Sequence, residues 1–240
     1  MAKIDFLCSA CGKPGSIEVE LTGDEHIDAV IQRTAKRAAH DKCVDRNEQI
    51  AIAQQNLARE QNAMRFWQTL CPDEFRKPIK WSKSGSNRRQ KLYAAILAWT
   101  PKQGKGLYVF GPSGTCKTRF CWHMLHREYN EGRTIVAVSH SDFRLRITAL
   151  ARDNQTEGVR WLSFLAGAQI LFVDDLGKGN TTGASEEAFH DLLDKRYRDN
   201  RPTVFTSERP VDALCEIFSA ERKEAILRRI DEATIKVSAL

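Results

Sequence analysis

The most regular pattern in this chain is an alternation of short apolar runs with longer stretches of helical spacing, which begins near position 91. The apolar runs are rich in β-branched and aromatic residues, which favour strands. Strands that alternate with helices predict βαβ units and a mostly parallel five-stranded sheet, hence an α/β fold. The predicted strands are 107–110, 134–139, 170–173, 202–206 and 234–237.

The first 90 residues have a different pattern. Within residues 1–44, positions 16–21 alternate as a strand would and 24–39 have helical spacing, but there are too few apolar residues for a large core. Residues 45–68 lack Gly and Pro and predict one polar helix, and the basic stretch 77–91 is typical of a linker. We therefore expect a small head over 1–44, a helix and linker over 45–90, and the main domain over 91–240.

Composition narrows the class of protein. Hydrophobic residues make up 42% of the chain, which is enough for a packed core. No apolar run approaches the ~20 residues that span a membrane, and the first residues lack the apolar stretch of a secretory signal. The odd number of cysteines, seven, is typical of a reducing compartment, so we expect a cytoplasmic protein that does not bind membranes. The net charge of +6 suits a nucleic-acid partner, although solubility alone also explains it.

Residues 106–118, GLYVFGPSGTCKT, have the order strand, glycine-containing loop and helix start. Gly111 and Gly114 permit a turn that points backbone N–H groups at phosphates, and the helix N-terminus favours the same anion. Lys117 would reach the β- and γ-phosphates of ATP, and the Thr118 hydroxyl would bind Mg²⁺. Cys116 stands where the usual pattern has Gly, and its small side chain is compatible with the loop. The predicted ATP-binding residues are Gly111, Pro112, Ser113, Gly114, Thr115, Cys116, Lys117, Thr118 and Arg119.

A second candidate site follows the apolar strand at 170–173, where the chain continues Asp174-Asp175-Leu-Gly. Mg²⁺ prefers few carboxylates and keeps several waters, so Asp174 would hold the ion, in part through water. Asp175 would orient and deprotonate the water that attacks the γ-phosphate. A strand-end turn alone would also explain two Asp residues, but the phosphate loop upstream favours the catalytic interpretation.

Four segments together resemble a known family: GPSGTCKTR, ILFVDDLGKG, DKRYRDNRPTVFTSERP and ILRRI. Their order is similar to that of the AAA+ helicase-loader and transposition-helper ATPases of the DnaC/IstB type, and TSERP is also similar to the sensor segment of the DnaA initiator. The resemblance covers residues 70–240. It implies a single AAA+ module without the helical lid, for which the sequence after the last motif leaves no room.

The resemblance also implies roles for two further motifs. Residues 206–208 would form the first sensor of the γ-phosphate, with Ser207 as the catalytic side chain. Arg229 would be the arginine finger, acting on the ATP of a neighbouring copy in a homo-oligomer, and Arg228 is its rival.

The cysteines near the start of the chain suggest a zinc site. Cys8 and Cys11 have the spacing of a zinc knuckle, and His40 and Cys43 lie three apart on a predicted helix. We expect these four side chains to bind Zn²⁺, with His26 as an alternative ligand. A redox pair and incidental free thiols are the other interpretations.

The main hypothesis is a weak ATPase that loads or regulates a DNA-handling machine, a replicative helicase or a transposase, and that DNA or this partner stimulates. Single-stranded DNA would contact the basic linker, in which Trp81 could stack on a base. A small-molecule kinase and a non-hydrolysing adaptor that binds ATP are the alternatives. The basic residues of the linker are Lys77, Lys80, Lys83, Arg88, Arg89 and Lys91.

Overall fold

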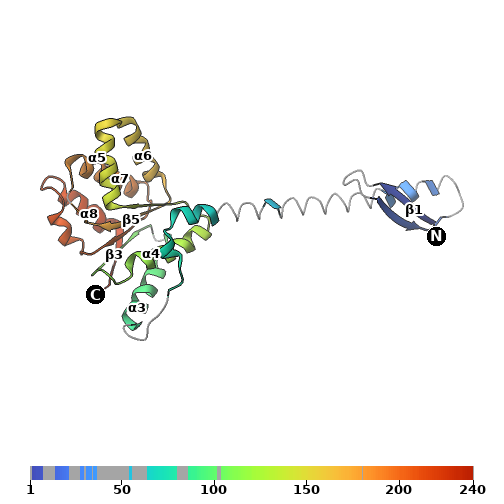
Figure 1. Cartoon of the computed structure of the whole chain (residues 1–240), viewed down its shortest axis with the longest axis horizontal. Coiled ribbons are helices and arrows are strands. Elements are labelled where there is room, and N and C mark those ends of the chain that lie inside the picture. Colours follow the sequence, from blue (N-terminus) through green and yellow to red (C-terminus); the bar gives the residue numbers. More distant parts are fainter. Residues whose placement is uncertain are drawn as a thin grey trace. The chain divides into compact units, whose positions relative to one another are not determined.

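The computed structural model of the chain (Figure 1) describes residues 2–7, 14–21, 28–29, 31–33, 35–36, 54–55, 64–79, 86–101, 104–179 and 181–239. The chain divides into two compact units, residues 1–66 and residues 67–240.

The first unit contains a two-stranded antiparallel sheet. Strands β1 (Ala2–Leu7) and β2 (Pro14–Val19) pair with Ile4 opposite Ile17. Half-buried and exposed positions alternate along both strands, as expected for a sheet with one covered face. The strand predicted at 16–21 is therefore present with earlier bounds, whereas its partner β1 was not predicted. Positions 28–29, 31–33 and 35–36 are helical, in agreement with the predicted helix over 24–39.

The second unit is built on a five-stranded sheet in the order β4-β5-β6-β3-β7, in which every pairing is parallel. The predicted α/β fold with a parallel sheet is thus confirmed. Among the described residues no helix follows β7, and no described helix is long and apolar enough to cross a membrane. The strands are β3 (Gly106–Phe110), β4 (Ile135–Ser139), β5 (Ile170–Leu176), β6 (Thr203–Ser207) and β7 (Thr234–Ser238).

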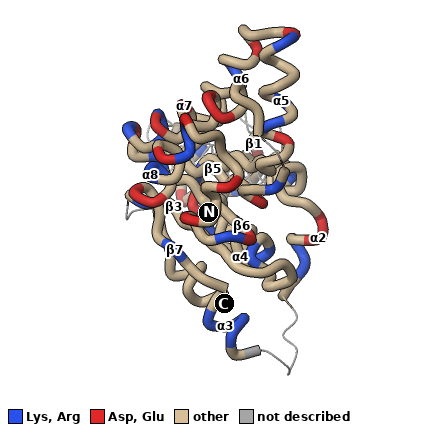
Figure 2. The backbone as a smooth tube through the Cα atoms, turned by 90° about the vertical axis from the view of Figure 1, so that its left-hand side faces the viewer, with Lys and Arg blue, Asp and Glu red and all other residues tan. Residues whose placement is uncertain are grey.

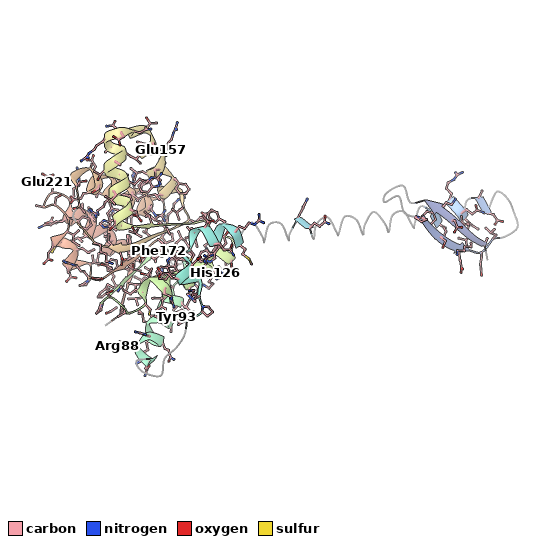
Figure 3. The ribbon with its side chains drawn as sticks, in the orientation of Figure 1. Arg88, Tyr93, His126, Glu157, Phe172 and Glu221 are labelled. Carbon is pink, nitrogen blue, oxygen red and sulfur yellow. The ribbon has the colours of Figure 1, made fainter. Side chains whose placement is uncertain are left out.

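Helices cover both faces of this sheet (Figure 1). On one face Leu107, Val109 and Phe172 pack against α3 (Ser86–Leu97) and α4 (Lys117–Asn130), and Figure 3 shows Phe172 inside this unit. On the other face Tyr108 and Phe205 pack against the remaining long helices. Because alternate residues of one strand face opposite sides, β3 contributes to both cores. The helices of the second face are α5 (His140–Asp153), α6 (Gln155–Gly167), α7 (Gly183–Arg198) and α8 (Lys223–Ala233).

The second unit begins earlier in the chain than the sequence predicts. Trp67 is 7% exposed, and its ring lies 5.7 Å from that of Trp122 on α4. The short helix α2 (Asp73–Arg76) follows, and α3 includes residues 86–91 of the predicted linker. The second unit therefore begins at residue 67 and not at 91, because apolar side chains upstream of position 91 belong to its core. The predicted boundary at 44/45 lies outside the described residues and stays a prediction. A short 3₁₀ helix, η2 (Asp212–Glu216), follows β6.

Candidate nucleotide-binding site

The order of the strands brings three predicted motifs to one edge of the sheet. Strand β6 lies between β3 and β5, and the three strands are parallel, so their carboxyl ends meet. The phosphate loop follows β3, the predicted sensor ends β6, and Asp174 and Asp175 lie near the end of β5. This edge of the sheet is the candidate nucleotide site.

The phosphate loop adopts a backbone with several residues at positive φ. Gly111, Gly114 and Cys116 have φ values of 141°, 77° and 66°. The Gly111 N–H donates to the Ser207 carbonyl at 3.2 Å, which joins the start of the loop to β6. Cys116 thus takes the left-handed conformation that the usual glycine would take, and α4 begins at the next residue.

Lys117 is the first residue of α4 and folds back over the loop. Its side chain is 6% exposed, and its Nζ donates to the carbonyls of Gly111 and Pro112, each at 2.8 Å. Burial lowers the pKa of Lys117, while the negative charges of Glu208 and Asp175 oppose this shift. The ammonium group is therefore held at the phosphate loop by these two carbonyls.

Thr118, Asp174 and Thr206 form a hydrogen-bonded group beside the loop. The Thr118 and Thr206 hydroxyls both donate to Oδ1 of Asp174, the first at 2.8 Å. Burial raises the pKa of Asp174, and these two hydrogen bonds oppose that rise. A hydroxyl and a carboxylate on adjacent elements are oxygen ligands of the kind that Mg²⁺ takes, so these residues fit the predicted ion.

Asp175 lies at an irregular point of β5. Its φ is 54°, and the β5–β6 register shifts between Val173 and Leu176. The carboxylate is 36% exposed and its Oδ2 lies 2.6 Å from Nζ of Lys178. The kink turns Asp175 out of the strand alternation and leaves its carboxylate accessible at the carboxyl edge. Lys178 lies within the motif ILFVDDLGKG, although no role was predicted for it.

The sensor segment contacts the site through a residue other than the one predicted. Ser207 is fully buried and its Oγ donates to the Leu176 carbonyl at 2.8 Å. Thr206 bonds Asp174, and its Oγ1 also accepts the Asp175 N–H at 3.0 Å. Neighbouring strand residues face opposite sides of a sheet, so only one of the two can face Asp174. These contacts correct Ser207 to Thr206 as the side chain beside the acidic strand end.

Two arginines near the loop make contacts that the sequence does not predict. Arg119 donates to the Glu74 carbonyl of α2 at 2.7 Å, and its nucleotide-binding role stays a prediction. Arg89 of α3 donates to the Gly114 carbonyl of the phosphate loop at 3.4 Å. Only the tertiary structure reveals this contact, since the two residues are 25 positions apart. The other predicted loop residues are at the site, where Thr115 Oγ1 donates to the Pro112 carbonyl at 2.8 Å and Ser113 is exposed.

The predicted finger lies away from this edge. Arg229 on α8 donates through Nε and Nη2 to Oδ1 of Asp194 on α7, at 2.9 and 2.5 Å. It lines a cavity of about 500 Å³ with Lys105 and Thr203, which lie at the amino ends of β3 and β6. Arg228 is more exposed, at 66% of its side chain, and lies 4.0 Å from Glu232.

The predicted zinc ligands Cys8, Cys11, His40 and Cys43 lie outside the described residues, as does the alternative ligand His26. Within the part of the chain that the structure describes, no group of three or more His, Cys, Asp or Glu side chains could hold a metal ion. The zinc site therefore stays a prediction.

Solved structures share the fold of the second unit. DnaI is 20% identical, with a TM-score of 0.58 over 70% of this chain and 94% of that one. The DnaC helicase loader is 18% identical, with a TM-score of 0.54 over 72% of this chain and 97% of that one. AMPPCP-bound DnaA from Aquifex aeolicus is 14% identical, with a TM-score of 0.53 over 66% of this chain and 48% of that one.

The search of curated proteins finds no match to this chain. The family model described as IstB-like ATP binding protein matches residues 26–239, which is most of the chain. The match agrees with the phosphate loop, the acidic strand end and the strand order found above, and it confirms the resemblance to DnaC/IstB-type AAA+ ATPases. The chain belongs to the IstB-like ATP-binding protein family.

Proposed function

We propose that this protein hydrolyses ATP in order to load or regulate a DNA-handling machine, as a helicase loader does. The observation that carries the proposal is the group of Lys117, Thr118, Asp174, Asp175 and Thr206 at one edge of the sheet. The fold shared with the DnaC helicase loader favours a replicative helicase as the partner. A transposase is the alternative, which the family match favours. Action in the cytoplasm is part of the same proposal.

The positions of these residues support the proposed hydrolysis. Lys117 and the N–H groups of the loop bind the phosphates of ATP and offset their charge. Thr118 and Asp174 would hold Mg²⁺, which would supply charge neutralisation at the phosphates of ATP. Asp175 accepts a proton from the attacking water, whose oxygen bonds to the γ-phosphorus as the bond to the β-phosphate oxygen breaks. Thr206 holds Asp174 and the backbone of Asp175 in place.

The test of this site separates binding from cleavage. Lys117→Ala removes the buried cation, so it should abolish ATP binding in a titration with a fluorescent ATP analogue. Asp175→Asn should bind ATP and not cleave it, because the amide cannot take the proton. Asp153→Asn, an exposed position at the end of α5, is the matched control and should behave as wild type. Unchanged phosphate release in both site variants would refute the assignment.

Arg229 serves a neighbouring copy in this proposal. The residue lies at the amino ends of β3 and β6, whereas the phosphate loop follows the carboxyl end of β3. A finger at that end suits an oligomer in which the next chain completes each ATP site, so we expect turnover to be weak before assembly. Arg229→Ala should bind ATP without cleaving it, and mixing it with Lys117→Ala protein should restore activity. Failure to restore activity, together with a monomeric wild type, would count against a finger in trans.

DNA is the proposed stimulating partner. Figure 2 shows basic positions along the start of α3, where Arg88, Arg89 and Lys91 are exposed. Lys80, Trp81 and Lys83 of the same predicted patch lie outside the described residues. Contacts to phosphates release counterions, so affinity for single-stranded DNA should fall steeply with salt. Replacing the three exposed residues by Ala should flatten this dependence, and an unchanged salt slope would remove α3 from the DNA site.

A further inference from the structure

The guanidinium group of Arg229 is held on all of its nitrogens. Nε and Nη2 donate to Oδ1 of Asp194, and Nη1 donates to Oε2 of Glu232 at 3.2 Å. The Tyr197 ring lies against the flat face of the guanidinium, with its centroid 4.4 Å from Cζ. An arginine side chain is long and flexible, so four contacts of this kind fix it in one conformation.

The two carboxylates hold Arg229 unequally. Asp194 is 24% exposed, binds two nitrogens, and also receives Nε of Arg198 at 3.1 Å on its other oxygen. Glu232 is 42% exposed and binds one nitrogen at the longer distance. The hydrogen bond from Arg229 holds the pKa of Asp194 below its ordinary value, so this carboxylate is charged at neutral pH. Glu232 is therefore the partner that a competing anion displaces more readily.

The space beside the guanidinium is open. Arg229, Tyr197 and Glu232 line the cavity of about 500 Å³ at the amino ends of β3 and β6. Its remaining lining includes Lys105 and Arg198, so its charge favours an anion. An anionic group that enters this space meets Arg229 already oriented.

We propose that Asp194, with Tyr197 packed on the guanidinium, positions Arg229 for the γ-phosphate of ATP bound to a second copy of this chain. Asp194 stays hydrogen-bonded to Nε and Nη2 of Arg229, and an oxygen of the γ-phosphate replaces Glu232 as the acceptor of the hydrogen bond from Nη1. Asp194 is a positioning residue, because it acts through Arg229 and does not touch the nucleotide. This inference rests on the proposed action of Arg229 in trans.

The experiment compares steady-state ATP hydrolysis by full-length Asp194→Asn and wild type over a range of ATP concentrations. Loss of a residue that orients a ligating or catalytic side chain typically lowers affinity or activity by about 10–100-fold, and we expect kcat of Asp194→Asn to fall by that factor. KM for ATP should not change, because the phosphate loop is intact. Asp194→Glu should recover part of kcat. Asp191→Asn, also on α7 and 71% exposed, is the matched control and should keep wild-type kcat.

Glu232→Gln tests the second half of the proposal. Removing the competing charge should raise kcat by no more than about fivefold, which is the worth of one exposed ion pair. A fall in kcat would show that Glu232 supports the finger and is not the ligand that the phosphate replaces.

A mixing experiment distinguishes positioning from a loss of structure. Asp194→Asn has an intact phosphate loop, and Lys117→Ala has an intact finger, so their mixture should regain activity. A folding defect in Asp194→Asn would leave the mixture inactive and overturn the inference. Full kcat in Asp194→Asn while Arg229→Ala is inactive would overturn this inference alone. Full kcat in Arg229→Ala would instead overturn the proposed finger.

Discussion

Cys116 occupies a backbone conformation that suits glycine, and replacing it with glycine should stabilise the protein. Its φ is 66°, and a left-handed residue with a Cβ costs about 1–2 kcal/mol. Glycine removes that cost but adds conformational freedom to the unfolded chain, worth about 0.5–1 kcal/mol. The Cys116 side chain offsets part of this gain, because it is half-buried against the core, and its Sγ lies 3.9 Å from the Gly114 carbonyl oxygen. The net gain for Cys116→Gly is about 0.5–1 kcal/mol.

Thermal unfolding followed by circular dichroism measures this gain. In a domain of this size 1 kcal/mol shifts Tm by about 2–4 °C, so Cys116→Gly should raise Tm by ~1–4 °C. Cys116→Ser is the first control, because it removes the thiol and keeps the Cβ. Asn200→Gly is the second control. Asn200 also has a left-handed φ, of 51°, but asparagine tolerates this conformation and the gain should be smaller.

One outcome of these unfolding measurements would contradict the expected stabilisation. If Cys116→Gly unfolds at a lower temperature than Cys116→Ser, the left-handed backbone at this position is not a source of strain and the reasoning fails. The same variants also test the nucleotide site. A relaxed loop should bind ATP at least as tightly as wild type, because the N–H groups of the loop keep their direction. Weaker ATP binding by Cys116→Gly would mean that the thiol itself contributes to the site.

Three further predictions concern other parts of the chain. Burial lowers the pKa of His140 from 6.5 to about 4, so acidification through this window should cost about 3 kcal/mol of folding stability. Urea titrations at pH 7 and pH 4.5 measure this loss, and it should be absent in His140→Asn. A Cβ on Gly106 would lie 1.9 Å from the Thr203 carbonyl oxygen, so Gly106→Ala should lower Tm by far more than Gly183→Ala, where nothing lies within 4 Å. One zinc ion per chain should be found by elemental analysis and lost in Cys8→Ser and Cys43→Ser, and metal retained in both variants would reject the predicted ligands.

The central strands of the sheet could be predicted from the sequence because they are buried on both faces. Strand β3 was expected at 107–110 and spans Gly106–Phe110, whereas the edge strand β7, which is mostly exposed and gave a weaker signal, was expected at 234–237 and spans Thr234–Ser238. Buried parallel strands are continuous apolar runs that end at polar turns, so their bounds are visible locally. The start of the main unit was not visible in this way. Trp67 lies within the predicted polar helix over 45–68, and only its packing against α4 shows that it belongs to the core.

The candidate site was predictable in its motifs and not in its tertiary contacts. Lys117, Thr118 and Asp174 were identified because a phosphate loop and an acidic strand end each have a local signature. The choice of Ser207 over Thr206 could have been corrected by strand alternation, since Thr206 shares the face of Val204, which packs towards α4. Lys178 lies in the same motif as its partner Asp175, three residues away. Arg89 reaches the Gly114 carbonyl of the phosphate loop from α3, and no spacing in the sequence signals that contact.

The two ends of the sheet are joined by strand β6 and helix α7. Thr206 at the carboxyl end of β6 bonds Asp174, and Thr203 at its amino end accepts Nε of Arg196 at 2.9 Å. Arg196 is 1% exposed and also donates to carbonyls of residues 165, 166, 168 and 202, so α7 is fixed against the sheet. Asp194, two residues earlier on α7, therefore belongs to a rigid support. The hydrogen bonds of Arg196 thus fix the helix that carries Asp194, which in turn holds Arg229.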